Sequence, residues 1–433
     1  MIWNPRCECM DRAELQLIQL ARLKETIARV YDRVAFCREL FDAHGVGPDH
    51  IREPGDIRRF PFTTKEALRD NYPYGLFAVP LKEVVRLHAS SGTTGKPVVV
   101  GYTRKDLDTW AELIARVATQ AGVTGDDVAQ IYFGYGLFTG AFGLHYGLER
   151  VGAAVVPVSA GNAERQVMLM RDFGTTVLVG TPSYTLHLAE AAMEMGVDPA
   201  GLPVRLGLFG AESWTEDMRA GLERAWGIKA TDNYGLSEVI GPGVAGECRY
   251  PGWMHIAEDH FLVEIIDPET GSVLADGREG ELVITTLTKE AFPVIRYRTR
   301  DISVLDRTPC PCGRTTARMR KVTGRTDDML IVSGVNVFPS QIESVLMSIE
   351  GIAPHYQIIV DKNGFLDCLE VRVELTQELF TGQFRDLEAL EGKIRRRLSS
   401  VLSLTARVRL LEPRSLERST GKARRVIDRR VES

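Results

Sequence analysis

The stretch Ser90-Ser-Gly-Thr-Thr-Gly-Lys-Pro97 places four hydroxyl groups, two glycines and a lysine within eight residues. An apolar run from Val84 to Leu87 precedes it and Val98-Val-Val100 follows it, so we expect a loop that joins two strands. Glycine lets the backbone turn until its N–H groups converge, and such a loop with hydroxyls and a lysine suits phosphate oxygens. The stretch predicts a phosphate-binding loop, and the alternative is a polar surface hairpin.

This loop differs from the P-loop of nucleoside triphosphatases. The P-loop motif is Gly-x-x-x-x-Gly-Lys-Ser/Thr, and Ser90 stands here where the first glycine would be required. Lys96 is followed by Pro97, which lacks the N–H group that the start of a phosphate-binding helix would supply. The stretch is therefore not a P-loop.

The composition is that of an ordinary globular protein with two or more domains. The 433 residues are 44% hydrophobic and 26% charged, and the net charge of −5 predicts neither nucleic-acid nor membrane binding. No apolar run is long enough for a transmembrane helix, and the first residues lack the plan of a signal peptide. Seven scattered cysteines argue against a disulfide framework. We therefore expect a cytoplasmic protein.

Short apolar runs alternate with helical patterns between Val84 and about Asn233, which predicts a parallel sheet with crossover helices. Before this section, apolar residues at helical spacing predict helix from Asp11 to about Ala43, and the run Phe60-Pro-Phe-Thr-Thr-Lys65 predicts the entry of a further helix, capped by a threonine. The expected strands are Ile131–Phe133, Ala153–Val158, Thr176–Val179 and Val204–Phe209, with helices at Ala163–Phe173 and Tyr184–Gly196.

The pattern changes after Gly235. Apolar segments at Phe261–Ile266 and Glu281–Thr286, separated by Gly-rich turns, predict an antiparallel section. Apolar and charged residues then alternate from Leu369 to Leu375, a helical pattern covers 387–402, and a further strand is expected at Arg407–Leu411. The expected fold is α/β, with residues 1–326 as a large N-terminal domain and 327–433 as a small α+β domain.

Eight motifs occur in the order in which a known enzyme family has them. They are Ser90–Pro97, Tyr135–Gly140, Gly210–Ser213, Asp232–Glu238, Tyr297–Asp301, Gly324–Asp328, Gly334–Ser340 and Gly421–Lys422. On these residues, and from Trp3 to Arg425, the chain resembles the phenylacetate–coenzyme A ligases of the adenylate-forming superfamily. The resemblance implies that the large domain binds and adenylates, while the small domain is mobile.

The resemblance also implies a nucleotide site. The residues for the β- and γ-phosphates of ATP are Ser90, Ser91, Gly92, Thr93, Thr94, Gly95 and Lys96. The residues along adenine are Gly210, Ala211 and Glu212, with Asp232, Asn233, Tyr234, Gly235 and Ser237 in the neighbouring motif and Tyr234 stacking on the ring. Asp301 matches the carboxylate that binds both ribose hydroxyls, and Arg325 would contact ribose or phosphate.

Three residues would act in catalysis by the same resemblance: Lys422, Glu238 and Lys96. Glu238, with Thr94, would hold Mg²⁺, since hard oxygen ligands suit this cation, although a carboxylate near a helix start has the same pattern. Lys422 matches the adenylation lysine, whose charge could bridge the substrate carboxylate and the α-phosphate. A solvated lysine in a basic tail is the alternative.

Further positions follow from the matching motifs. Asp327 would be the hinge between the domains, and Gly334 and Val335 would approach the pantetheine arm of coenzyme A. Tyr135, Gly136, Phe138, Ala141 and Phe142 would line the acyl pocket, where aromatic and small residues suit a flat aryl acid, and core packing is the alternative.

Four residues form a candidate zinc set: Cys248, His255, Cys310 and Cys312. Three sulfurs and one imidazole make a good tetrahedral donor set, and a closed set of four is structural. Relatives in the family often carry the same residues. Free buried thiols are the alternative, because the separation of the two halves fits no common zinc finger.

The resulting prediction is an AMP-forming ligase that uses ATP and Mg²⁺ to join an arylacetic acid, with phenylacetate as the leading candidate, to coenzyme A. One alternative is an aryl-acid adenylating enzyme that loads a carrier protein. Another is a nucleotide-binding protein with a degenerate site, which the intact Glu238, Asp301 and Lys422 disfavour. A homodimer is expected by family analogy, without nucleic-acid or membrane partners.

Overall fold

A computed structural model of the chain describes residues 1–90, 97–327, 330–332, 335–363, 366–380, 384–402, 404–418 and 425–430. The α-helices are α1 (Pro5–Glu8), α2 (Arg12–Arg33), α3 (Ala35–Ala43), α4 (Lys65–Asp70), α5 (Arg104–Ala121), α6 (Gly140–Val151), α7 (Ala163–Asp172), α8 (Pro182–Glu194), α9 (Glu216–Trp226), α10 (Pro339–Met347), α11 (Gln377–Phe380) and α12 (Phe384–Leu402).

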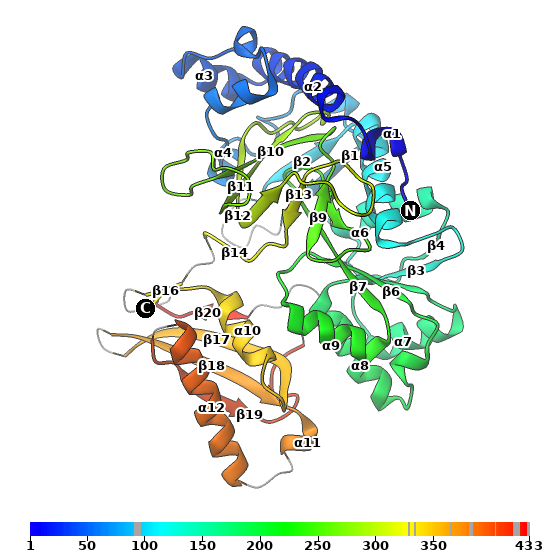
Figure 1. Cartoon of the computed structure of the whole chain (residues 1–433), viewed down its shortest axis with the longest axis vertical. Coiled ribbons are helices and arrows are strands. Elements are labelled where there is room, and N and C mark those ends of the chain that lie inside the picture. The colour runs from blue at the N-terminus through cyan, green and yellow to red at the C-terminus, as the bar shows by residue number, and fades with distance from the viewer. Residues whose placement is uncertain are drawn as a thin grey trace.

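The strands fall into a large sheet and three small ones (Figure 1). They are β1 (Arg86–Ala89), β2 (Val99–Tyr102), β3 (Val128–Ile131), β4 (Ala154–Val156), β5 (Val177–Gly180), β6 (Leu206–Gly210), β7 (Lys229–Leu236), β8 (Gly241–Glu247), β9 (Trp253–Ile256), β10 (Phe261–Ile266), β11 (Glu279–Thr286), β12 (Tyr297–Asp306), β13 (Arg318–Arg320), β14 (Gly324–Arg325), β15 (Leu330–Val332), β16 (Val335–Val337), β17 (Ile352–Asn363), β18 (Leu366–Leu375), β19 (Arg407–Leu411) and β20 (Val426–Asp428).

The N-terminal helical segment is divided in two at Val34, which has an extended backbone with φ −115° and ψ 104°. Asp11 caps α2 by accepting a hydrogen bond from the Ala13 N–H, and an apolar stripe that includes Leu23 and Ile27 is fully buried. The bend at Val34, itself 1% exposed, lets α2 and α3 bury separate apolar faces in the same core.

The predicted parallel and antiparallel sections are two parts of one sheet. Its main path runs β10-β11-β12-β13-β9-β8-β7-β6-β5-β3-β4, and β14 pairs with β12. The strands from β4 to β7 are parallel, whereas β7 pairs with β8 in the antiparallel sense and the rest of the path is antiparallel. The two sections therefore meet at β7, which carries the predicted Asp232–Glu238 motif.

The strand expected at Ile131–Phe133 begins earlier, as β3 at Val128. β3 contains a polar residue, Gln130, that is fully buried, and this residue interrupts the apolar run by which the strand was predicted. The Gln130 side chain donates to Gln166 and accepts from the Thr175 hydroxyl, so its burial leaves the amide satisfied.

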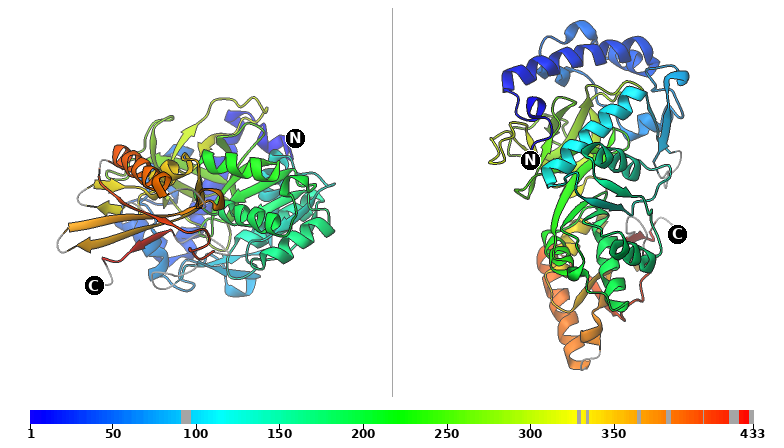
Figure 2. Two further views of the ribbon diagram at one scale, coloured as in Figure 1. Left: turned by 90° about the horizontal axis from the view of Figure 1, so that it is seen from below. Right: turned by 90° about the vertical axis from the view of Figure 1, so that its right-hand side faces the viewer.

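The C-terminal part contains the predicted α+β unit. Its four-stranded sheet has the order β19-β18-β17-β20, and a separate apolar core lies between this sheet and α10 and α12. Figure 1 shows this unit at the opposite end of the long axis from α2 and α3, and Figure 2 shows it beside the green section that contains α8 and α9. The boundary between residues 326 and 327 stays a prediction.

Within the described ranges, none of the helices combines the length and the apolar character needed to cross a bilayer.

Candidate active site

The residues predicted to bind adenine lie at or near the carboxyl ends of β6 and β7, where open α/β sheets bind their ligands. Gly210 ends β6, and a Cβ atom there would stand 2.6 Å from the Asn233 carbonyl oxygen, so the two strand ends approach too closely for a larger residue. The next residue, Ala211, is exposed and has a left-handed backbone with φ 70°. This turn leaves the backbone of 210–212 open to a ligand.

Glu212 connects this turn to α8. Its carboxylate accepts hydrogen bonds from the backbone N–H of Ser183 (2.7 Å) and from the Ser183 hydroxyl (2.9 Å). A carboxylate at a helix N-terminus is favoured by the helix dipole. Desolvation nevertheless raises the pKa of Glu212, because the surrounding protein removes water from it. Glu212 therefore positions the turn, together with the start of α8.

Three separate motifs meet at Asp301. The Tyr234 hydroxyl donates to Asp301 Oδ2 at 2.5 Å, and the Arg325 guanidinium donates to Oδ1 at 2.9 Å. β12 and β14 pair so that Asp301 and Arg325 stand opposite each other. Arg325 also donates twice to Asp327, and these bonds outweigh desolvation and lower the pKa of that carboxyl. The result is a buried carboxylate with fixed oxygens next to the adenine turn.

The other residues of the Asp232–Glu238 motif have different surroundings. Asp232 is buried, and desolvation raises the pKa of its carboxyl to about 7. The Asn233 amide donates to the Phe209 carbonyl at 2.6 Å and so joins β7 to β6. Gly235 lies at an irregular point of the β7–β8 pairing, where a side chain would collide with the Gly241 backbone.

Glu238 is a buried carboxylate beside a cation. It is 7% exposed, and its Oε1 lies 3.9 Å from Lys65 Nζ at the first position of α4. Thr64 caps this helix as predicted, by accepting from the Ala67 N–H. Thr139 Oγ1 and Ser237 Oγ lie 2.9 Å apart, which brings the Tyr135–Gly140 segment to the same place.

The predicted pocket residues surround the start of α6. The Tyr135 hydroxyl lies 3.0 Å from His145 Nδ1, and the Tyr135 ring meets the Phe142 ring edge-on with centroids 5.2 Å apart. Gly136 and Phe138 are exposed, with Phe138 at 52%, whereas Ala141 is fully buried in the core. Four of the five residues are thus available to line a surface pocket, and Ala141 packs behind them.

The hairpin of β1 and β2 carries the predicted phosphate loop. Ser90 closes it: its N–H donates to the Val98 carbonyl and its hydroxyl oxygen accepts from the Val98 N–H, both at 2.9 Å. The Ala89 N–H donates to the Leu137 carbonyl at 3.0 Å, so the loop begins beside the pocket segment. Val335 begins β16 and pairs with Val332. Predicted residues outside the described part of the chain are Ser91, Gly92, Thr93, Thr94, Gly95, Lys96, Gly334 and Lys422.

Two family models and several curated relatives match this chain. Residues 73–288 match the AMP-binding enzyme family, and residues 334–430 match the AMP-binding enzyme C-terminal domain. Phenylacetate-coenzyme A ligase of Aromatoleum evansii is 50% identical over 426 residues, which cover 98% of this chain and 96% of that protein. The ligase of that name from Escherichia coli (strain K12) is 49% identical over 436 residues and 99% of each chain. The chain belongs to the phenylacetate–coenzyme A ligase family.

A related ligase has been solved in two states, and this chain resembles one of them more than the other. 2-Hydroxyisobutyryl-CoA ligase in the postadenylation state, in complex with 2-HIB-AMP, is 28% identical and superposes with a TM-score of 0.94 over 100% of this chain and 93% of that one. The same enzyme with 2-HIB-AMP and CoA in the thioesterification state gives 0.74 at 29% identity over 99% and 92% of the chains. The parts of this chain are therefore arranged as in the postadenylation state.

The fold brings the four residues of the predicted zinc set close together. The ligand atoms of Cys248, His255, Cys310 and Cys312 all lie within 4.8 Å of one another. His255 Nε2 is 3.3 Å from Cys312 Sγ, and the Cys248 and Cys310 sulfurs are 3.9 Å apart. His255 Nδ1 lies 3.1 Å from the Thr316 hydroxyl, which orients the ring. The four groups converge although Cys248 follows β8, His255 lies on β9, and Cys310 and Cys312 lie in the turn after β12.

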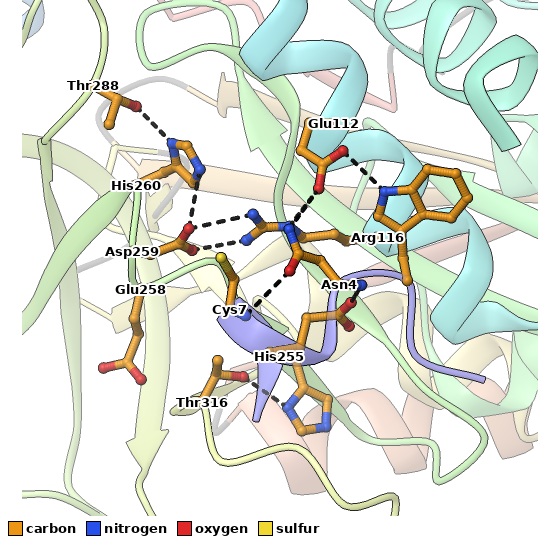
Figure 3. A network of polar contacts seen from close by, with 12 residues as sticks. Asn4, Cys7, Glu112, Arg116, His255, Glu258, Asp259, His260, Thr288 and Thr316 are labelled. Carbon is orange, nitrogen blue, oxygen red and sulfur yellow. Dashed lines mark hydrogen bonds and ion pairs between the residues drawn. The ribbon is translucent and has the colours of Figure 1, made fainter. Parts of the chain in front are cut away.

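A polar network beside this cluster secures the N-terminal segment (Figure 3). Asp259 accepts from Arg116 at 2.8 and 3.3 Å and lies 3.1 Å from His260 Nε2. Glu112 on α5 accepts from the Asn4 amide at 3.1 Å. Arg314 connects the N-terminal segment to the cysteine–histidine cluster, since it donates to Glu8 at 2.6 Å and to Cys312 Sγ at 3.6 Å. The cluster is thus packed against the first residues of the chain.

Two site contacts were not predicted from the sequence: Lys65 faces Glu238, and Thr139 contacts Ser237. The Thr63-Thr64-Lys65 run was visible as the entry to a helix, and this helix places Lys65 beside the site. Thr139 belongs to the Tyr135–Gly140 motif already associated with the pocket. Neither contact could be predicted from spacing, because each joins segments far apart in the chain.

Proposed function

We propose that this protein is an AMP-forming ligase that joins phenylacetate to coenzyme A. The observation that carries the proposal is the meeting of three nucleotide motifs at Asp301, where Tyr234 and Arg325 fix the carboxylate beside the adenine turn. Membership of the ligase family supports the reaction, and relatives about 50% identical over nearly the whole chain support phenylacetate as the acid.

The first half-reaction would form an acyl-adenylate. A carboxylate oxygen of phenylacetate attacks the α-phosphorus of ATP, and the bond to the leaving pyrophosphate breaks. No general base is required, because a carboxylic acid is already ionised at neutral pH. The protein's task is to position the two substrates and to neutralise charge, for which Lys422 and Lys96 are the proposed cations.

The second half-reaction would transfer the acyl group to sulfur. The coenzyme A thiol loses its proton and attacks the acyl carbonyl, and AMP leaves as the carbonyl–phosphate bond breaks. Gly334 and Val335 are proposed to lie along the pantetheine arm. Asp301 serves both halves, because its carboxylate oxygens would accept hydrogen bonds from the ribose hydroxyls of ATP and of the acyl-adenylate.

Magnesium fits the proposed site chemically. Glu238 offers a buried carboxylate oxygen, a ligand type that Mg²⁺ prefers, and Thr94 would add a hydroxyl. The ion would neutralise the phosphate charge that builds up as pyrophosphate leaves. Lys65, which contacts Glu238 at 3.9 Å, would keep that carboxylate oriented toward the phosphates.

Zinc fits the cysteine–histidine cluster. Three sulfurs and an imidazole nitrogen within 4.8 Å of one another supply four donors of the types that Zn²⁺ binds. With all four positions filled by protein, the ion would be structural and would join the residue after β8, and β9, to the turn after β12. The Thr316 contact to His255 supplies the outer partner that such ligands usually have.

The two-domain division is also part of the proposal. Residues 1–326 would form the AMP-binding domain and residues 327–433 the small domain, with Asp327 as the hinge. The apolar core of residues 330–406 is separate from the two apolar clusters within residues 1–326, and this separation supports the division, as does the pairing of Arg325 with Asp327. A cytosolic location and a homodimer stay predictions.

Pyrophosphate release tests the function. The purified protein is given ATP, Mg²⁺ and a panel of aryl and aliphatic acids, with and without coenzyme A. We expect phenylacetate to lead the panel and release to be sustained only with coenzyme A. Release led by another acid would contradict the substrate, while release with phenylacetate that coenzyme A does not sustain would contradict the acceptor. Silence across the panel would contradict the proposed reaction.

A further inference from the structure

Helix α8 carries two acidic residues at its C-terminal end, Glu190 and Glu194. The partial negative charge of a helix C-terminus disfavours carboxylates there, and the last turn of α8 has no basic residue of its own to compensate. Glu212 at the other end has the favourable placement. The acids at the C-terminal end therefore need cations from outside the helix.

Two basic residues of the small C-terminal unit contact these acids. His355 Nε2 on β17 lies 3.1 Å from Glu190 Oε1 and 3.4 Å from Oε2. Arg414, which follows β19, pairs with Glu194. Within the large part, His187 Nδ1 lies 3.7 Å from Glu190. Two acidic groups on one helix thus contact two basic groups across the junction between the parts.

Arg418 adds to this contact and leads toward Lys422. Its charge acts on Glu190, and although desolvation alone would raise the pKa of Glu190, the two histidines and Arg418 lower it to about 2. Arg418 is itself held by Glu374, with donor–acceptor distances of 2.9 and 2.8 Å.

Residues Arg414, Leu416 and Arg418 all contact the same carboxylate. Glu374, on β18, is 1% exposed and also accepts from the backbone N–H groups of Arg414 (3.1 Å) and Leu416 (2.6 Å). Residues 414–418 therefore move with the small sheet, and Arg418 precedes Lys422 by only four positions. A contact that fixes this segment on α8 also limits where Lys422 can reach.

We infer that the acidic end of α8 is the docking surface that holds the small domain in the arrangement of the postadenylation state, and that Glu190 is a positioning residue for the first half-reaction. The inference rests on the proposed function. The TM-scores of 0.94 and 0.74 against the postadenylation and thioesterification structures assign the contact to the former arrangement. A contact that exists in only one arrangement of the small domain shifts the equilibrium toward that arrangement by the free energy of the contact.

The test separates the two half-reactions. Pyrophosphate release by the unaltered protein with phenylacetate is established first, so that a failure of the proposed function is seen before any variant is compared. Formation of acyl-adenylate is then followed by ATP–pyrophosphate exchange. Thioester formation is followed with supplied phenylacetyl-adenylate and coenzyme A, a reaction that also reports whether a variant is folded.

In Glu190→Gln we expect exchange to fall by about two- to fivefold, the effect of losing a partly exposed charged contact. Thioester formation from supplied adenylate should be unchanged or faster. His355→Asn should give the same pattern, and the double variant should lose less than the product of the two single effects. Glu391→Gln is the matched control, because Glu391 pairs with Arg395 at 3.6 Å inside α12.

An equal fall in both half-reactions would overturn the inference, because it would show that Glu190 supports the fold and not one arrangement. Exchange unchanged in both Glu190→Gln and His355→Asn would also overturn it. A multiplicative double variant would contradict a direct contact between the two residues.

Discussion

The proposed nucleotide site and the contact at the end of α8 are built in different ways. Asp301, Tyr234 and Arg325 belong to strands of one hydrogen-bonded sheet, and the Asp301 carboxylate is 7% exposed. Glu190 and His355 belong to units with separate cores, and they meet only through side chains. The first arrangement persists as long as the sheet is folded, whereas the second can open without disturbing either core.

This difference separates residues needed throughout turnover from residues needed in one arrangement. Groups fixed inside the sheet should affect both half-reactions, because the AMP moiety is present in both. Groups on the small domain or at its docking surface should affect mainly the half-reaction for which that arrangement is used. Measuring the two half-reactions separately in suitable variants tests this distinction.

The largest effect is expected for Lys422→Ala. Loss of the proposed bridging cation should slow acyl-adenylate formation by about 10³-fold, the size seen when one charge-stabilising group is removed. Thioester formation from supplied phenylacetyl-adenylate should persist, and both rates are measured as described for Glu190. Lys393→Ala, at an exposed position of α12, is the control. Equal loss in both half-reactions would show that Lys422 is structural.

Asp301→Asn should lower kcat/KM for ATP by about 10²-fold, since hydrogen bonds to a charged group contribute roughly 1.5–3 kcal/mol each. In contrast to Glu190→Gln, this variant should also slow thioester formation from supplied adenylate. Asp306→Asn is the matched control, because Asp306 lies on the same strand and pairs with Arg318. Loss confined to one half-reaction would contradict the comparison.

Metal at the cysteine–histidine cluster should stabilise the large part without changing the balance of the half-reactions. With free zinc at 100 times its Kd, binding adds about 2.7 kcal/mol to the free energy of unfolding. Cys312→Ser should remove the bound zinc measured by elemental analysis and most of this stabilisation. Cys368→Ser, outside the cluster on β18, should change neither. Equal zinc content in both variants would contradict the assignment.

The smallest effect concerns Lys289, a buried amine of the large part. No hydrogen-bond acceptor for its Nζ is present in the described residues, and the ammonium lies 3.1 Å from the centre of the Tyr102 ring. Desolvation lowers the pKa of Lys289 to about 7. Lys289→Met should raise the free energy of unfolding at pH 7 by about 1 kcal/mol, because the desolvation cost exceeds the gain from the ring.

The pH dependence of this gain has a definite sign. The folded-state pKa of Lys289 lies below the model-peptide value of about 10.4, so the folded protein disfavours the charged form. The penalty is full below pH 7 and disappears as the pH rises toward the unfolded value. Denaturant melts at pH 6.5 and pH 9 should therefore show a smaller advantage of Lys289→Met at the higher pH. An advantage that grows with pH would contradict this account. Lys105→Met, at an exposed position, is the control.

The sequence predicted strands best where their patterns were local and simple. Phe261–Ile266 and Arg407–Leu411 were predicted with the bounds that β10 and β19 have. β3 was misplaced because Gln130 is buried and satisfied by tertiary partners, which a periodicity cannot reveal. The break at Val34 was missed because both helices continue the same apolar spacing.

For the site, the sequence predicted the motifs and the family, and the relatives confirm the family. The convergence of Tyr234, Asp301 and Arg325 agrees with the proposed nucleotide site. Contacts between distant segments were beyond the sequence, because nothing in a motif specifies which side chain it meets. The Glu190–His355 contact is the clearest example, since both residues lie outside every motif.

Product analysis tests the central proposal most directly. The protein is incubated with phenylacetate, ATP, Mg²⁺ and coenzyme A, and the thioester and nucleotides are quantified by liquid chromatography and mass spectrometry. We predict one AMP and one pyrophosphate for each phenylacetyl-coenzyme A, and no thioester when ATP is omitted. Formation of ADP and phosphate in step with thioester, or ATP turnover without any thioester, would contradict the account.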